Sequence, residues 1–146
     1  MMKAITVTTQ AELEQTFALR KEVFVDEQKV PLEDEFDAFD TLVADCAHVL
    51  VVDGEVPVGC GRLRVVDGVG KLERIVTKKL MRKSGVGREV VRALETLAKE
   101  RGLEQVKLHG QTQAEQFYQK LGYHTASDIF MEDGIEHVVM MKKVVD

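Results

Sequence analysis

The sequence has few of the features that mark several classes of protein. It has no tryptophan and only two prolines among 146 residues, and no apolar run approaches the roughly 18 residues that cross a membrane. The first fifteen residues lack the apolar core of a secretion signal. Lys and Arg number 20 against 25 Asp and Glu, which gives a net charge of −5 rather than the basic face of a nucleic-acid-binding protein. We therefore expect a cytoplasmic protein without nucleic-acid or membrane partners.

Cysteine is equally scarce. Cys46 and Cys60 are the two cysteines, and without a secretion signal they are expected to be reduced thiols. No CxxC pair occurs, and the four histidines show no close spacing of the kind that metal ligands have. No metal site is predicted.

The composition is that of a globular protein, with 45% hydrophobic and 31% charged residues, and we expect one domain over residues 1–146. Asp-Gly pairs at 53–54, 67–68 and 133–134 lie between runs rich in Val, Ile, Leu and Met, a pattern that predicts β-hairpins. The expected strands are 3–8, 47–52, 56–66, 69–77, 104–109, 123–131 and 136–144.

Three helices are predicted between these strands. Thr9 and Glu12 form a capping box, so a helix is expected from residue 9 to about residue 25. Residues 85–101 carry apolar side chains at helical spacing, and Thr112 with Glu115 predicts a further capped helix that Gly122 ends. The order of elements predicts an α+β fold, with a mixed, mainly antiparallel sheet and helices packed against it.

The segment 82–88, Arg-Lys-Ser-Gly-Val-Gly-Arg, lies where the second helix begins. Gly85 and Gly87 leave the first backbone N–H groups of the helix uncovered, and these groups together with the helix dipole favour an anion. Arg82, Lys83 and Arg88 add positive charge, so a phosphate or pyrophosphate is the expected ligand. The alternative is a glycine-rich helix start with a solvated basic rim.

The R-x-x-G-x-G pattern of Arg82 to Gly87 resembles motif A of the GNAT superfamily of N-acetyltransferases. A second block, Gln111-x-x-Ala114-x-x-x-Tyr118-x-x-x-Gly122-Tyr123, is similar to a second pattern of that family at matching spacing. Residues 20–28 further resemble the small ElaA-like, or YjcF-like, bacterial branch. The resemblance covers nearly the whole chain and implies a GNAT-like sheet with helices on both faces.

The resemblance also implies roles for individual residues toward acetyl-CoA. Backbone groups of a splayed strand edge at Ile75, Val76 and Thr77 are expected to pair with the pantetheine arm, and one of these amides to polarise the thioester carbonyl. Tyr118 is expected near the sulfur, where its hydroxyl can protonate the departing thiolate or donate a hydrogen bond to it. Gln111 replaces the usual Asn beside the pantetheine arm. The expected pyrophosphate site comprises Arg82, Lys83, Ser84, Gly85, Val86, Gly87 and Arg88.

An alkyl amine is protonated at pH 7, so its direct attack on the acetyl group requires a base. Glu73 is the first candidate, because alternation along the strand predicts that it shares a face with Ile75 and Thr77. The alternative role for Glu73 is an ion pair with Lys71 or Arg74. His109, at the end of the next strand, is the second candidate base. Its alternative role is to cap a loop.

An acidic loop follows the first helix and contains Glu33, Asp34, Glu35, Asp37 and Asp40. Charge runs of this kind are usually solvated surface. The alternative hypothesis is that the loop overhangs the acceptor site, is anchored by Phe36 and Phe39, and attracts a cationic amine.

The sequence as a whole predicts an acetyl-CoA-dependent N-acetyltransferase that acts on a small amine or a peptide amine in a ternary complex, without a covalent enzyme intermediate. Two alternatives remain. One is a non-catalytic acyl-CoA-binding or regulatory module on the same fold, and the other is a protein that binds a phosphate ligand unrelated to CoA. A homodimer paired through the strand 137–144 is also possible in principle.

Overall fold

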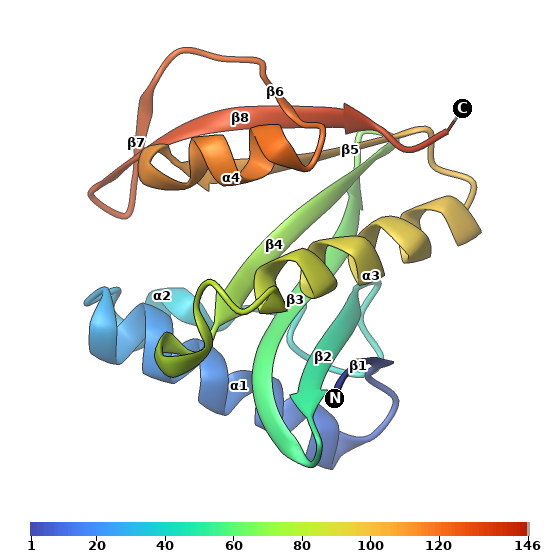
Figure 1. Cartoon of the computed structure of the whole chain (residues 1–146), viewed down its shortest axis with the longest axis vertical. Coiled ribbons are helices and arrows are strands. Elements are labelled where there is room, and N and C mark those ends of the chain that lie inside the picture. Colours follow the sequence, from blue (N-terminus) through green and yellow to red (C-terminus); the bar gives the residue numbers. More distant parts are fainter. Residues whose placement is uncertain (146) are drawn as a thin grey trace.

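The computed structural model describes residues 1–145 and is shown in Figure 1. The chain alternates strands with short helices along nearly its whole length. The strands are β1 (Met2–Thr6), β2 (Ala47–Asp53), β3 (Val56–Val66), β4 (Val69–Thr77), β5 (Gln105–Gln111), β6 (His124–Thr125), β7 (Phe130–Glu132) and β8 (Ile135–Lys143). The α-helices are α1 (Gln10–Arg20), α2 (Leu32–Glu35), α3 (Val86–Glu100) and α4 (Glu115–Lys120). A π-helix, η1 (Lys21–Glu27), continues α1, and η2 (Lys79–Met81) and η3 (Thr112–Ala114) are 3₁₀ turns.

All of the strands belong to one sheet, with the order β1-β2-β3-β4-β5-β8-β6 and with β7 also paired to β8. The β4–β5 pair is parallel and the other pairs are antiparallel. This mixed, mainly antiparallel α+β sheet confirms the predicted fold class. Because β8 has strand partners on both sides, the expected pairing of a second copy along residues 137–144 is wrong.

Two apolar cores cover the two faces of the sheet. Along β2, Val49 and Val51 pack in the core under α3, while Leu50 and Val52 pack in the core under α1. Successive side chains of a strand point to opposite faces, so this alternation separates the helices onto the two sides. Figure 1 shows α1 and α3 crossing different faces of the strands β2–β4.

The predicted start of the first helix is confirmed. The Thr9 side chain accepts a hydrogen bond from the Glu12 amide, and the Glu12 carboxylate accepts from the Thr9 amide. The helix then widens into the π-helix η1 and reaches Glu27, two residues beyond the prediction. The helix predicted at 85–101 is observed as α3.

Two expectations for the last third of the chain are wrong. Thr112 caps no helix: it begins the 3₁₀ turn η3, and α4 starts at Glu115, whose carboxylate accepts a hydrogen bond from Thr125 instead. The strand expected at 123–131 is two short strands, β6 and β7, joined by a loop in which the Ser127 hydroxyl accepts from the Val139 amide.

No helix within residues 1–145 combines the length and the apolar character that spanning a membrane requires.

Candidate functional site

The strands β4 and β5 separate partway along their length. They pair only from Gly70 with Val106 to Leu72 with Leu108, and beyond these residues Figure 1 shows them diverging. On its other edge β4 stays paired to β3 as far as Thr77. The edge of β4 that faces β5, at Ile75 to Thr77, is therefore open, as the sequence predicts.

A bulge interrupts β4 at the same place. Arg62 pairs with Glu73 and Cys60 with Val76, so two residues of β4 lie opposite the single residue Gly61. Arg74, one of these two, has a left-handed φ of 55°. The bulge reverses the alternation of the faces. Ile75 packs with the core under α3, whereas the Glu73 carboxylate points to the other face. The expectation that Glu73 shares a face with Ile75 and Thr77 is wrong.

A cavity of about 790 Å³ occupies the gap between the strands. Every residue that the sequence assigned to catalysis or to acetyl-CoA borders it except Ser84 and Val86. The Val86 side chain is buried in the core under α3, and the Ser84 amide donates to the Met81 carbonyl. The residues that border the cavity as predicted are Glu73, Ile75, Val76, Thr77, Arg82, Lys83, Gly85, Gly87, Arg88, Gln111 and Tyr118.

The N-terminus of α3 faces one end of the cavity. The first hydrogen bond of the helix runs from the Glu89 amide to the Gly85 carbonyl, so the amides from Gly85 to Arg88 precede it. Gly85 has a φ of 87°, which only glycine adopts at low cost. A side chain at Gly87 would lie 3.1 Å from the Phe117 ring. Helix dipole, uncovered amides and nearby cations make this end fit a pyrophosphate.

The residues Glu27 and Gln28, at the end of η1, contact both sides of the cavity. The Glu27 carboxylate accepts two hydrogen bonds from Arg82, at 2.6 and 2.8 Å, and Gln28 accepts one from Gln111 at 3.0 Å. Two residues expected to bind acetyl-CoA thus have partners within the chain. The two bonds to Glu27 use two of the five N–H donors of Arg82, so a phosphate would share this guanidinium with Glu27 or displace it.

Tyr118 lies on α4 with its ring against Gly110 of β5. Its hydroxyl has no hydrogen-bond partner within residues 1–145. Every buried polar side-chain atom of that range has a partner, so the Tyr118 hydroxyl oxygen is not a buried atom. The hydroxyl is therefore open to the cavity that Tyr118 borders. A tyrosine hydroxyl is protonated at neutral pH and can act as a donor, and burial of the side chain raises the pKa of Tyr118 further.

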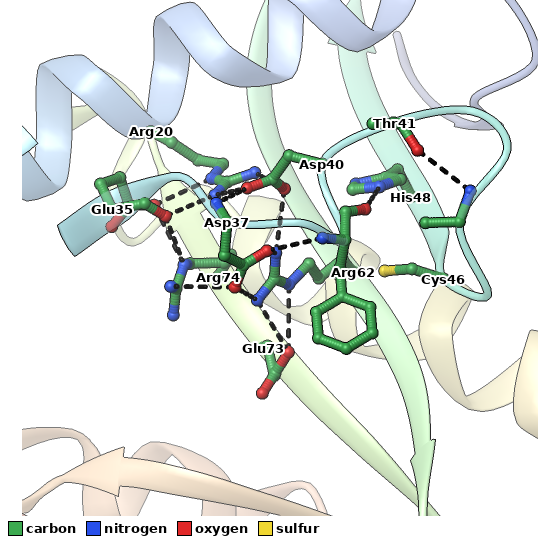
Figure 2. A network of polar contacts seen from close by, with 12 residues as sticks. Arg20, Glu35, Asp37, Asp40, Thr41, Cys46, His48, Arg62, Glu73 and Arg74 are labelled. Carbon is green, nitrogen blue, oxygen red and sulfur yellow. Dashed lines mark hydrogen bonds and ion pairs between the residues drawn. The ribbon is translucent and has the colours of Figure 1, made fainter. Parts of the chain in front are cut away.

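Glu73 belongs to a buried ion-pair network beneath the cavity, shown in Figure 2. Its carboxylate lies within 3.0 Å of nitrogens of Arg62, Arg64 and Lys71. Burial alone would raise the pKa of Glu73, but the hydrogen bonds from Arg64 and Lys71 and the charge of Arg62 outweigh it and lower the pKa to about 2. A carboxylate with so low a pKa is a poor proton acceptor at neutral pH, which favours the ion-pair role.

The inner carboxylates of the acidic loop belong to the same network. Glu35 and Asp40 pair with the buried Arg20, and Asp37 and Asp40 pair with the buried Arg62, as Figure 2 shows. Because these three carboxylates already face arginines, the hypothesis that the loop attracts a cationic amine loses its basis. Glu33 and Asp34 are exposed and do not border the cavity.

The expected anchoring of this loop by aromatic rings is confirmed. The Phe36 ring packs edge-on against Phe17, with ring centroids 5.2 Å apart, and under the guanidinium of Arg20. The Phe39 ring lies 4.2 Å from the guanidinium carbon of Arg64.

The β7–β8 hairpin supplies residues that the sequence reasoning missed. Glu132, Asp133 and His137 border the cavity, and the Glu132 carboxylate lies 2.9 Å from Nδ1 of His109. The Asp133-Gly134 signal placed the hairpin correctly, but the register that brings Phe130 and Gln111 beside His137 depends on strand pairing. Neither cysteine borders the cavity, and burial raises the pKa of Cys46 to about 11.

Residues 6–144 match the family model described as "Acetyltransferase (GNAT) domain". The chain therefore belongs to the GNAT family of acetyltransferases, as its motifs predict. It is 53% identical over 142 residues to a protein of Bacillus subtilis named as an acetyltransferase, with 97% of each chain covered. It is 45% identical to the N-acetyltransferase YjcF of the same organism, covering 97% of this chain and 99% of YjcF.

The crystal structure of ElaA from Escherichia coli superposes with a TM-score of 0.85 at 26% identity, over 97% of this chain and 99% of ElaA. The similarity to YjcF and to ElaA agrees with the branch that residues 20–28 resemble.

Proposed function

We propose that the protein transfers the acetyl group of acetyl-CoA to a primary amine, by direct attack while both substrates are bound. The observation that carries the proposal is the single cavity that joins an open strand edge, an uncovered helix N-terminus and the hydroxyl of Tyr118. These are groups suited to an amide-rich arm, a pyrophosphate and a departing thiolate, respectively.

The donor is held mainly by the backbone in this proposal. Amides from Gly85 to Arg88 bind the pyrophosphate with help from Lys83 and Arg82. Backbone groups that point to the open edge of β4, between Ile75 and Thr77, pair with the pantetheine arm, and the Gln111 amide adds a polar contact. The thioester supplies an activated acetyl group, so the chain itself needs no covalent nucleophile.

Tyr118 acts on the leaving group. Its hydroxyl, which like any tyrosine hydroxyl is protonated at neutral pH, donates a hydrogen bond to the sulfur as negative charge develops there. Glu73 was the first candidate for the base that deprotonates the amine. Its three cationic partners and its low pKa support a different role, which is to hold the bulged segment of β4 in position.

Isothermal titration of acetyl-CoA and of CoA tests the donor site. We expect the wild-type protein to bind both, and the variant carrying Arg82→Ala and Gly87→Glu to bind neither. Thiol release from acetyl-CoA in the presence of primary amines then tests turnover. Binding without turnover for every amine would instead support an acyl-CoA-binding module, and no binding by the wild-type protein would contradict the proposal.

A further inference from the structure

His109 and Glu132 form a pair where β5 and the β7–β8 hairpin border the cavity. We call this part of the cavity the acceptor end. Nδ1 of His109, on β5, lies 2.9 Å from Oε1 of Glu132, on β7. A glutamate is ionised near neutral pH, and an ionised carboxylate can only accept a hydrogen bond. Nδ1 must therefore carry the proton. In a neutral imidazole the lone pair is then on Nε2.

Nε2 of His109 is free to act. Within residues 1–145 it has no hydrogen-bond partner. Every buried polar side-chain atom of that range has a partner, so Nε2 is not buried and is accessible. His109 and Tyr118 border the same cavity from opposite faces of the sheet, because Gly110 lies against the Tyr118 ring and the His109 side chain, one residue earlier on β5, points the other way. A proton acceptor and a proton donor thus open into one space.

Aromatic rings surround the pair. The Phe130 ring packs edge-on against His109, with centroids 5.1 Å apart, and is stacked on His137 at 6.0 Å. Nδ1 of His137 lies 2.8 Å from the Ile135 carbonyl, and its Nε2 lies 3.6 Å from Oε2 of Glu132. The Phe130 ring therefore limits the rotation of the His109 imidazole, and the carboxylate of Glu132 lies between the two histidines.

We propose that His109 is the general base that deprotonates the acceptor amine and that Glu132 is a positioning residue that holds its Nε2 lone pair toward the cavity. The proposal rests on the proposed function, since it assigns the base for that reaction. It also replaces Glu73, whose carboxylate is already bound by Arg62, Arg64 and Lys71.

The charged and titratable groups around His109 come from several elements. Besides Glu132 and His137, they are Asp133 in the β7–β8 turn, Tyr118 on α4, Lys107 as a neighbour on β5, and Lys71, Glu73 and Arg74 on β4. Lys71 is paired with Glu73, and Arg74 with Glu35. Glu132 is therefore the carboxylate that acts directly on the imidazole.

The protons balance in this scheme. The acceptor arrives as an ammonium ion, and Nε2 of His109 takes one proton, which solvent later removes. The N–C bond then forms and the C–S bond breaks, with the electron pair leaving on sulfur. A second proton leaves the nitrogen as the amide forms, and the sulfur gains one through Tyr118, so the products are the acetamide, CoA thiol and one released proton.

Two amines of nearly equal size isolate the base. Ethylamine is an ammonium ion at neutral pH and must lose a proton before it can attack, whereas 2,2,2-trifluoroethylamine is already neutral there and skips this first deprotonation. With ethylamine we expect kcat/KM to fall about 100-fold in His109→Gln and about tenfold in Glu132→Ala, within the range for general bases. With trifluoroethylamine the same variants should stay within about threefold of wild type. Glu136→Gln, a charge change on the same hairpin at an exposed residue that does not border the cavity, is the control.

The pH dependence gives a second readout. The acidic limb of kcat/KM for ethylamine should disappear in His109→Gln, which has no imidazole to protonate, and persist in Glu136→Gln. Equal losses with both amines would mean a structural role and would overturn the proposal, as would wild-type rates with ethylamine in His109→Gln.

Nuclear magnetic resonance tests the pair without any acceptor. Long-range ¹⁵N–¹H spectra should show His109 as the Nδ1–H tautomer, assigned by the signal lost in His109→Gln, and Glu132→Ala should shift it toward Nε2–H. If wild-type protein acetylates neither amine, the proposed function fails, and this spectrum decides the pair separately. An Nε2–H tautomer in the wild type would overturn it.

Discussion

The two ends of the cavity are constructed differently. The end proposed to bind the donor comes from one continuous segment, the open edge of β4 at 75–77 and the start of α3 at 85–88, and it offers mostly backbone groups. The end proposed to bind the acceptor is made of side chains from α2, β4, β5, β7 and the start of β8. A backbone site depends on local conformation, whereas a side-chain site depends on how distant segments meet.

Two glutamates sharpen the contrast within the acceptor end. The side chain of Glu73 is 8% exposed and faces three cations, so its negative charge is already paired within the protein. The side chain of Glu132 is 43% exposed and faces the two imidazoles of His109 and His137. A carboxylate paired with several cations stabilises the fold, while a carboxylate hydrogen-bonded to an imidazole can orient that imidazole.

The largest expected effect comes from breaking the network beneath the acceptor end. Arg62→Met leaves Asp37, Asp40 and Glu73 without a shared partner, and losing one member of a buried ionic group costs about 3–5 kcal/mol. Urea denaturation measures the change in the free energy of unfolding. Arg64→Met loses its pair with Glu73 and its contact with the Phe39 ring but leaves Glu73 paired with Arg62 and Lys71, so it should cost less, about 2 kcal/mol. Equal losses would contradict the central place of Arg62.

Acid should weaken the same network. The pKa of Glu73 is lowered from 4.5 to about 2 on folding, so its contribution to stability is complete above pH 4.5 and declines as the pH falls toward 2. Denaturation midpoints measured across this window should drop steadily in the wild-type protein. The drop should be shallower in Glu73→Gln, and identical slopes for the two proteins would count against the ion-pair role.

At the donor end, Gly87→Glu introduces a negative charge where the pyrophosphate is proposed to bind. Like charges brought together cost several kcal/mol, so acetyl-CoA should bind about 100-fold more weakly by calorimetry. Ser84→Glu adds the same charge to the same loop, but Ser84 does not border the cavity and the loss should be much smaller. Similar losses would indicate an effect of overall charge rather than of this site.

Tyr118→Phe removes the donor proposed for the sulfur. We expect kcat to fall at least tenfold with little change in KM, because the hydrogen bond strengthens only as C–S cleavage proceeds. Tyr123→Phe removes a neighbouring hydroxyl that donates to Glu95 and should leave kcat unchanged. An unaltered kcat in Tyr118→Phe would remove this residue from the chemistry.

The smallest expected effect is on acetyl-CoA affinity and comes from the pair between Glu27 and Arg82. Glu27→Gln removes the carboxylate that holds Arg82, so acetyl-CoA no longer competes with an ion pair and should bind about threefold more tightly, the scale of one exposed pair. Asp26→Asn changes the neighbouring exposed charge and serves as the control. Weaker binding in Glu27→Gln would show that Glu27 orients Arg82 instead of competing for it.

The sequence by itself determined the order of elements, the hairpins at the Asp-Gly pairs and the donor end. Each depends on residues close together in the chain, such as Gly85 and Gly87 at a helix start, so local conformation is enough to predict them. The family followed from two such motifs at fixed spacing.

Only the tertiary structure decided the acceptor end. One bulge at Arg74 moved Glu73 to the opposite face, which alternation along a strand cannot anticipate. The partner of His109 lies 23 residues away and is brought to it by β8, which pairs with both strands. The sequence indicated a solvated acidic loop. In the structure its carboxylates at Glu35, Asp37 and Asp40 pair with arginines of α1 and β3, because buried charges need partners of opposite sign.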